Sequence, residues 1–286
     1  MKYADHVYRS ADDRLDLYAR IYGVEGPPLL LMHGLTRNSA DFEELAAHLA
    51  GKYQLIVPDQ RGRGRSDYDP DPQKYTPAVY VDDMFALIDG LKLEKLGLIG
   101  TSLGGLMAMM MAAISPERFA SLILNDIGPA VEAGGLERIQ SYVGPRAPFD
   151  NWQQAADQCQ AVHGDSMVGF DTQDWLSFAR RTCREMPDGK ICFAYDPEIA
   201  QGLSGSAASA VPADLWAIWD RLSALPTLII RGALSDILSP ATVAEMKRRH
   251  PENISAVEIA ARGHAPMLDE PDALAAIDGF LAGIEN

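Results

Sequence analysis

Short apolar runs alternate with longer segments of helical periodicity along most of this chain of 286 residues. Residues 29–32 form a continuous apolar run, as in a strand covered on both faces, and residues 39–49 carry apolar side chains at helical spacing. Further strands are expected near residues 15–22, 55–57, 96–99, 122–124, 227–230 and 256–259, and further helices near 79–91, 103–114, 215–219, 242–249 and 272–284. Strands separated by such helices imply right-handed crossovers. The pattern predicts an α/β fold with a mainly parallel sheet of about eight strands flanked by helices.

The alternation stops after Gly128-Pro129 and resumes near residue 214. Between these points the chain is helical in pattern, rich in aromatic residues and interrupted by Gly and Pro. An insertion of about 80 residues between two strands is usually functional rather than a simple connection. We therefore expect residues 1–128 and 214–286 to form the core, and residues 129–213 to form a helical cap inserted after the sixth strand. Two aromatic residues of this cap, Trp152 and Trp175, are candidate substrate contacts.

Charge and composition exclude several classes of function. The chain has 25 basic and 40 acidic residues, a net charge of −15, so it lacks the basic surface that binds nucleic acid. Its longest apolar run, residues 103–114, is shorter than the roughly 18 residues of a membrane span. The N-terminus is polar, and the three cysteines form no CxxC pair. We expect a cytoplasmic protein without membrane, nucleic-acid or metal partners; the sequence leaves the oligomeric state open.

The most specific motif is Gly100-Thr101-Ser102-Leu103-Gly104-Gly105, which matches G-x-S-x-G. It lies between an expected strand and an expected helix, which is the context that this motif requires. Glycine permits a tight turn, and such a turn lets Ser102 adopt a strained backbone that projects its hydroxyl above the sheet. The motif predicts that Ser102 is a nucleophile.

A serine nucleophile needs a base and an acid to orient that base. His264 follows the last expected strand, whereas the histidines at 6, 48, 163 and 250 have polar neighbours typical of surface or cap positions. Asp236 follows the strand at residues 227–230, so the order Ser102, Asp236, His264 satisfies the motif. Asp126 also follows a strand and is the competing candidate, with loop bracing or pocket lining as its alternative role.

The remaining element is an oxyanion hole, which needs two backbone N–H groups. Leu103 supplies one as the residue after the nucleophile. Leu35, in the loop that begins at His33-Gly34, is the candidate for the second. Each donor of this kind typically stabilises the transition state by several kcal/mol.

These residues together resemble the α/β-hydrolase fold superfamily, in particular its cap-bearing serine hydrolases. The resemblance rests on His33-Gly34, residues 59–67, residues 100–105, Asp236 and Gly263-His264, and it covers nearly the whole core but not the cap. It implies hydrolysis through an acyl-enzyme without metal or organic cofactor. Ser102 excludes the aspartate-nucleophile mechanism of dehalogenases and epoxide hydrolases of this fold.

We therefore expect a serine hydrolase that cleaves a small carboxylic ester or lactone. Two alternatives remain at this stage. One is a carbon–carbon bond hydrolase of ring-cleavage products with the same triad, although the chain has Leu35-Thr36-Arg37-Asn38 where those enzymes usually carry a glycine-rich stretch. The other is a catalytically slow ligand-binding receptor on the same fold.

Overall fold

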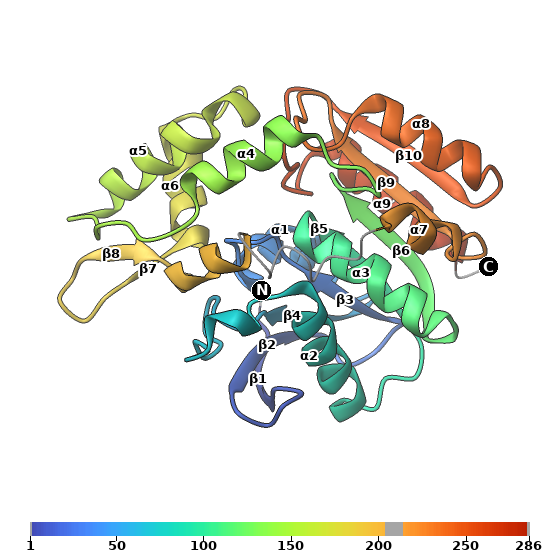
Figure 1. The fold of residues 1–286 in the computed structure, drawn as a ribbon, viewed down its shortest axis with the longest axis horizontal. Coiled ribbons are helices and arrows are strands. Elements are labelled where there is room, and N and C mark those ends of the chain that lie inside the picture. Colours follow the sequence, from blue (N-terminus) through green and yellow to red (C-terminus); the bar gives the residue numbers. More distant parts are fainter. Residues whose placement is uncertain (1, 204–213, 285–286) are drawn as a thin grey trace.

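The computed structural model describes residues 2–203 and 214–284. Its centre is an eight-stranded sheet in the order β1-β2-β4-β3-β5-β6-β9-β10 (Figure 1). The strands are β1 (Ala4–Arg9), β2 (Asp16–Tyr22), β3 (Pro28–Met32), β4 (Gln54–Asp59), β5 (Leu96–Thr101), β6 (Phe119–Asn125), β9 (Thr227–Gly232) and β10 (Ile254–Ile259). Strands β4, β3, β5, β6, β9 and β10 pair in parallel, and β2 joins β4 in antiparallel. The predicted α/β fold with a mainly parallel sheet is confirmed.

Successive residues of the central strands face opposite layers of core. In β3, Leu29 and Leu31 join one hydrophobic cluster, and Leu30 and Met32 join the other. All four side chains are buried, because helices cover both faces of the sheet. This explains why the central strands are continuous apolar runs.

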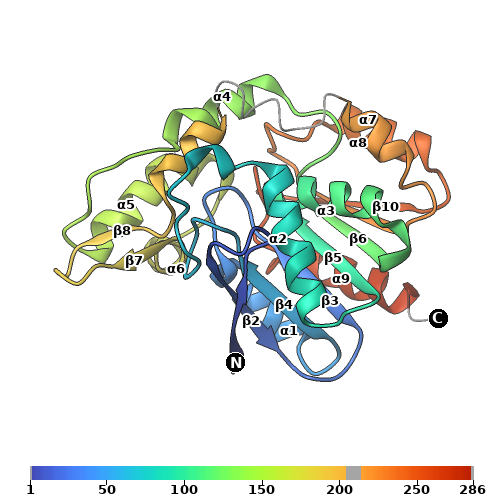
Figure 2. The ribbon, with the colours of Figure 1, turned by 60° about the horizontal axis from the view of Figure 1, so that its bottom comes forward.

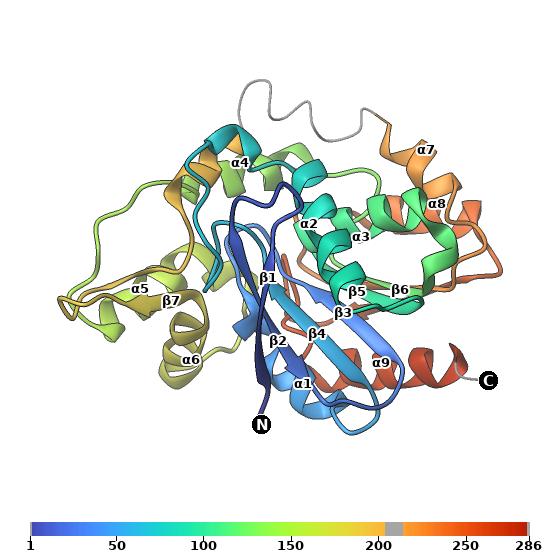
Figure 3. The ribbon, with the colours of Figure 1, turned by 90° about the horizontal axis from the view of Figure 1, so that it is seen from below.

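The helices divide between the two faces as the crossovers require (Figures 2 and 3). One face carries α1 (Glu43–Leu49) and α9 (Pro271–Ile284), and the other carries α2 (Pro77–Gly90), α3 (Leu103–Ile114), α7 (Leu215–Asp220) and α8 (Pro240–Arg249). The expected helix at 39–49 is a 3₁₀ turn, Ser39–Phe42, followed by α1.

The first strand was not predicted. Most residues of β1 are exposed, including the apolar Val7, and Tyr8 is its one buried side chain. The strand pairs in antiparallel with β2 at the edge of the sheet, where only one face is covered. Edge strands of this kind give a weak apolar signal.

The segment after β6 forms a separate lobe beside the carboxyl ends of the strands (Figure 1). It contains α4 (Ala133–Tyr142), α5 (Trp152–His163), α6 (Thr172–Thr182) and a hairpin of β7 (Cys183–Glu185) and β8 (Ile191–Phe193). This short hairpin was not expected in a helical cap. The predicted end of the cap at residue 213 lies outside the described residues. No helix in the described part of the chain is long and apolar enough to cross a membrane.

Candidate active site

Ser102 occupies the sharp turn between β5 and α3. Its φ of 53° and ψ of −116° lie in a region that costs a non-glycine residue of order 1–3 kcal/mol. The neighbouring glycines make this turn possible: a Cβ on Gly100 would lie 2.4 Å from the Gly104 carbonyl oxygen, and one on Gly104 would lie 2.0 Å from that of Met32. The motif therefore forms the predicted tight turn, with Ser102 at its apex.

A continuous chain of hydrogen-bonding groups runs from Ser102 into the core. His264 Nε2 lies 2.8 Å from Ser102 Oγ, and His264 Nδ1 lies 2.8 Å from Asp126 Oδ2. His264 is 8% exposed and Asp126 is fully buried. The Asp126 carboxylate also accepts hydrogen bonds from Gly232 N at 2.9 Å and Ser235 Oγ at 2.6 Å. These two donors fix the carboxylate in position beside the imidazole.

The predicted contact between Asp236 and His264 is wrong. Asp236 instead receives two hydrogen bonds from Arg138 of α4, at 2.6 and 2.9 Å. Its side chain is 40% exposed. The Arg138 guanidinium lowers the pKa of the Asp236 carboxyl below its usual value. Asp236 thus joins α4 to the core, and the competing candidate, Asp126, lies on the histidine.

Loop geometry explains this exchange. Asp126 comes directly after the last residue of β6, whereas Asp236 lies four residues beyond the end of β9. The intervening loop turns around Ser235, whose hydroxyl accepts hydrogen bonds from the backbone N–H groups of Ile237 and Leu238. Ser235 itself faces Asp126, and the next side chain, Asp236, faces α4. Strand-end placement alone does not specify the direction of a side chain within such a loop.

Buried polar contacts fix the loop after β3. The backbone N–H of Gln60 donates to His33 Nε2 at 3.1 Å, so the proton of this ring is on Nδ1, which donates to the Gly34 carbonyl at 2.7 Å. Burial lowers the pKa of His33 to about 3, so the ring stays neutral. Arg37 N also donates to the Gly34 carbonyl. The Gly34 carbonyl and the Leu35 N–H belong to the same trans peptide group, so they point in opposite directions. The Leu35 N–H therefore points away from the His33 and Arg37 donors.

The other predicted oxyanion donor, besides Leu35, is Leu103, the first residue of α3. The first N–H groups of a helix have no partner within the helix, and the helix dipole there favours a negative charge. Leu35 lines the same cavities as Ser102, and a Cβ on Gly34 would lie 3.8 Å from that of Ser102. The arrangement brings both predicted donors to the nucleophile.

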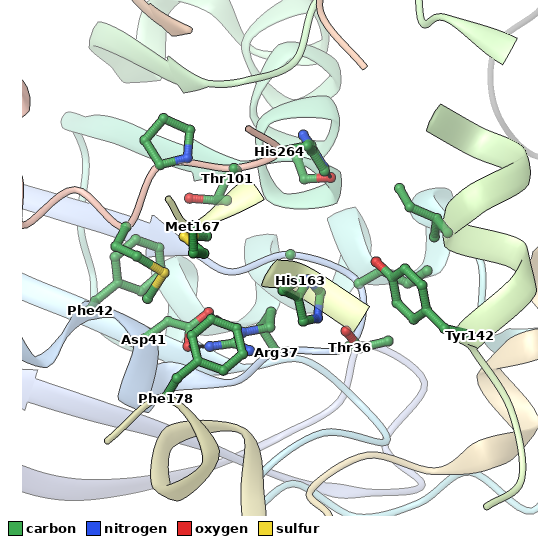
Figure 4. A pocket seen from close by; sticks show the side chains of 17 residues that line it. Thr36, Arg37, Asp41, Phe42, Thr101, Tyr142, His163, Met167, Phe178 and His264 are labelled. Carbon is green, nitrogen blue, oxygen red and sulfur yellow. Dashed lines mark hydrogen bonds and ion pairs between the residues drawn. The ribbon is translucent and has the colours of Figure 1, made fainter. Parts of the chain in front are cut away.

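Two cavities meet at Ser102, Leu35 and Ile139. The narrow cavity, of about 80 Å³, is also lined by His264 and by several polar side chains from the cap, from the segment after β3 and from the end of β5 (Figure 4). These polar residues are Thr36, Arg37, Asp41, Thr101 and His163. The wide cavity, of about 410 Å³, continues past Leu103 and Leu106 and contains no charged side chain among the described residues that line it.

The two tryptophans do not reach these cavities. Trp175 is 4% exposed and packs in a hydrophobic cluster internal to the cap, where its ring contacts Phe170 and Phe178. Trp152 packs at the edge of the same cluster beneath Arg180. Neither is among the described residues that line the narrow or the wide cavity. Their expected role in substrate binding is therefore replaced by a role in cap packing.

Two histidines expected at surface or cap positions are less exposed than their sequence neighbours suggest, although His250 is the C-cap residue of α8. His163, expected at a surface or cap position, lines the narrow cavity at the end of α5. His250 is 4% exposed and stacks on Trp219, with ring centroids 4.8 Å apart. The polarity of its sequence neighbours does not predict whether a histidine at the end of a helix is covered by another helix or strand. Among the described residues, no group of three His, Cys, Asp or Glu side chains is placed to hold a metal ion.

Comparison with known proteins agrees with this geometry. The family model of the alpha/beta hydrolase fold matches residues 27–271. The chain belongs to the α/β-hydrolase family. A crystal structure of an alpha/beta hydrolase from Novosphingobium aromaticivorans has a TM-score of 0.92 and 42% identity, and the match covers 98% of each chain.

Two curated relatives of this α/β hydrolase have named activities. A 3-hydroxybutyrate-oligomer hydrolase of Cupriavidus necator is 35% identical over 260 residues, which cover 89% of this chain and 88% of the relative. A 2-(acetamidomethylene)succinate hydrolase of Mesorhizobium japonicum is 30% identical over 253 residues, covering 87% and 86%. The protein is thus a hydrolase of the α/β fold.

Proposed function

We propose that this α/β hydrolase is a serine hydrolase that cleaves small carboxylic esters, lactones included, through an acyl-enzyme. The observation that carries the proposal is the unbroken chain from Ser102 through His264 to Asp126, with 2.8 Å at each of its two contacts. The nucleophile end of this chain opens into two cavities, and its acid end is fully buried.

In the proposed reaction, His264 Nε2 removes the proton of Ser102 as Oγ attacks the ester carbonyl carbon. Asp126 orients the imidazole and stabilises its cation. The backbone N–H groups of Leu35 and Leu103 hold the oxyanion. The ester C–O bond then breaks, and the imidazolium gives its proton to the departing alkoxide. A water molecule, deprotonated by His264, hydrolyses the acyl-enzyme and regenerates Ser102.

One of the two curated relatives supports an ester substrate. The Cupriavidus necator relative is named for oligomers of 3-hydroxybutyrate, and it matches nearly the full length of this chain. Units of a hydroxy acid are joined through ester bonds. The wide cavity, with no charged side chain among its described lining residues, suits an acyl chain, which is the apolar part of a simple ester.

A serine-directed fluorophosphonate and a substrate panel test the proposal. The panel contains hexanoyl and butanoyl esters, a five-membered and a six-membered lactone, and a dienoic ring-cleavage product. We expect stoichiometric labelling of the wild type, no labelling of Ser102→Ala, and multiple turnovers on at least one ester or lactone.

The other outcomes contradict the proposal in distinct ways. Labelling without turnover of any panel member would favour the ligand-binding receptor. Turnover of the dienoic compound alone would favour the carbon–carbon hydrolase. Ester turnover that persists in Ser102→Ala would show that the nucleophile is another group.

A further inference from the structure

Among the described residues, the general base His264 lines only one of the two cavities. His264 lines the narrow cavity, and it is not among the described residues that line the wide cavity. At Ser102 the wide cavity is bordered instead by Leu103 and Leu106 of α3. The imidazole that takes the serine proton must also protonate the leaving oxygen, so the leaving oxygen lies within hydrogen-bond reach of Nε2. The departing alcohol therefore faces the narrow cavity.

The size of each cavity agrees with this direction. The narrow cavity, of about 80 Å³, has about a fifth of the volume of the wide cavity, so it has room for far fewer non-hydrogen atoms. The wide cavity is about 410 Å³, and two of its lining residues, Val131 and Leu136, are exposed apolar residues. A long acyl chain fits the wide cavity, and the narrow cavity accepts only a short alcohol.

His163 gives the narrow cavity a hydrogen-bond donor. Its ring stands between those of Tyr142 and Phe178, with centroid distances of 5.4 and 5.3 Å (Figure 4). Neither ring nitrogen has a hydrogen-bond partner among the described residues. Burial, with Arg37 and Arg138 nearby, lowers the pKa of His163 to about 3. The neutral ring therefore offers one N–H donor at the pH where the enzyme works.

The charged pair next to His163, formed by Arg37 and Asp41, already has hydrogen-bond partners within the protein. Arg37 makes two short hydrogen bonds to the Asp41 carboxylate and a third, of 2.6 Å, to Thr182. Its guanidinium lies 4.1 Å from the centre of the Phe178 ring. The Arg37–Asp41 pair has no net charge, and it forms the part of the cavity wall next to His163. His163, in contrast, makes no hydrogen bond to another described residue.

We propose that the alcohol part of the ester occupies the narrow cavity, where His163 donates a hydrogen bond to an oxygen atom of that alcohol, while the acyl part occupies the wide cavity. The proposal rests on the proposed serine-ester mechanism and specifies its substrate class. This class consists of esters between an apolar acyl chain and a short alcohol that carries a second oxygen, such as a diol or a hydroxy acid.

The test compares 2-hydroxyethyl hexanoate with propyl hexanoate, whose alcohols have the same number of non-hydrogen atoms. We expect kcat/KM of the wild type to favour the 2-hydroxyethyl ester about fivefold to tenfold, the range that one neutral hydrogen bond provides. His163→Phe, which keeps an aromatic ring, should abolish this preference, so that the ratio of the two kcat/KM values falls to about one. His163→Gln, which retains an N–H donor, should restore part of it.

Rapid quenching and mass measurement separate the two halves of the reaction. Both esters give the same hexanoyl-enzyme, so the decay rate of this intermediate should be unchanged within twofold in His163→Phe.

Val131→Trp, at the wide cavity, should lower kcat/KM for hexanoyl esters at least fivefold relative to acetyl esters without changing the alcohol preference. A third ester, 3-(hexanoyloxy)butanoate, identifies the oxygen: its faster cleavage, lost in His163→Phe, would support a carboxylate-bearing alcohol within the proposed class.

The assignment of the cavities would be overturned if His163→Phe kept the wild-type preference, or if it slowed decay of the hexanoyl-enzyme. The second result would place the acyl group beside His163. Ester turnover that persists in Ser102→Ala would instead refute the serine mechanism, so the two failures are distinguishable.

Discussion

At the scale of single residues, two aspartates that follow parallel strands have separate tasks. Asp126 is fully buried and contacts His264, whereas Asp236 is partly exposed and pairs with Arg138. In the proposed mechanism, only the first carboxylate holds the imidazole in the tautomer that accepts the serine proton.

Asp126→Asn should therefore lower kcat on the best ester by on the order of 10⁴-fold, because an amide favours the wrong imidazole tautomer. Asp236→Asn is the matched control and should lower kcat less than about threefold, because its ion pair is partly exposed. Steady-state kinetics of the two purified variants decide between them. A larger loss in Asp236→Asn than in Asp126→Asn would contradict the assignment of the acid.

His33 gives a prediction about stability. Its pKa is lowered from 6.5 to about 3 in the folded protein, because the ring is buried and neutral. Between these values the unfolded chain binds more protons, so the free energy of unfolding falls as the pH decreases through this range. At pH 5 the cost from His33 is about 2 kcal/mol.

Urea unfolding of the wild type and of His33→Gln, each at pH 7.5 and pH 5.0, measures this cost. The decrease in unfolding free energy between the two pH values should be about 2 kcal/mol smaller in His33→Gln than in the wild type. Equal decreases would show that the pKa of His33 is not lowered by folding.

At the scale of elements, α4 is the part of the cap that closes over Ser102, and it packs tightly on the loop after β9. Ile139 of α4 lines both cavities, and the Arg138–Asp236 pair joins the helix to the core. A Cβ on Gly135 would lie 2.2 Å from the Asp236 carbonyl oxygen, whereas one on Gly134 would have no atom within 4 Å.

These adjacent glycines form a matched pair. Gly135→Ala must displace α4 from backbone atoms, so we expect a loss of about 1–3 kcal/mol in unfolding free energy and a higher KM. Gly134→Ala should be neutral or stabilise by up to about 1 kcal/mol, because alanine has the higher helix propensity. Thermal unfolding and ester kinetics of both variants test this. Equal effects of the two substitutions would contradict the close packing of α4.

Most helices and strands of the core could be predicted, because the buried faces of each give its sequence an apolar pattern with the period of a helix or a strand. The nucleophile helix was predicted with its observed bounds, residues 103–114, since all its residues are apolar or glycine and a serine stands at each end. The β1 strand was missed because only one of its faces is covered. The β7–β8 hairpin was missed because strands of three residues are too short for a pattern.

At the scale of the whole molecule, the site depends on contacts that a single sequence does not specify. Ser102 and His264 were predicted from a motif and a strand order, which fix positions along the sheet edge. Asp126 and Arg37 act through the direction of side chains across more than 100 residues, as in the 138-residue separation of Asp126 and His264 and the 145-residue separation of Arg37 and Thr182. Such directions depend on packing between the core and the cap, where no local pattern operates.

The central claim is that ester cleavage proceeds through an acyl group on Ser102. The most direct measurement mixes the wild-type enzyme with a hexanoyl ester, quenches the reaction in acid within milliseconds, and determines the mass of the intact protein and of its peptides. We predict a hexanoyl adduct on the peptide that contains Ser102, which forms and decays at rates that equal or exceed kcat. An adduct on a different residue, or ester turnover that persists in Ser102→Ala, would contradict this mechanism.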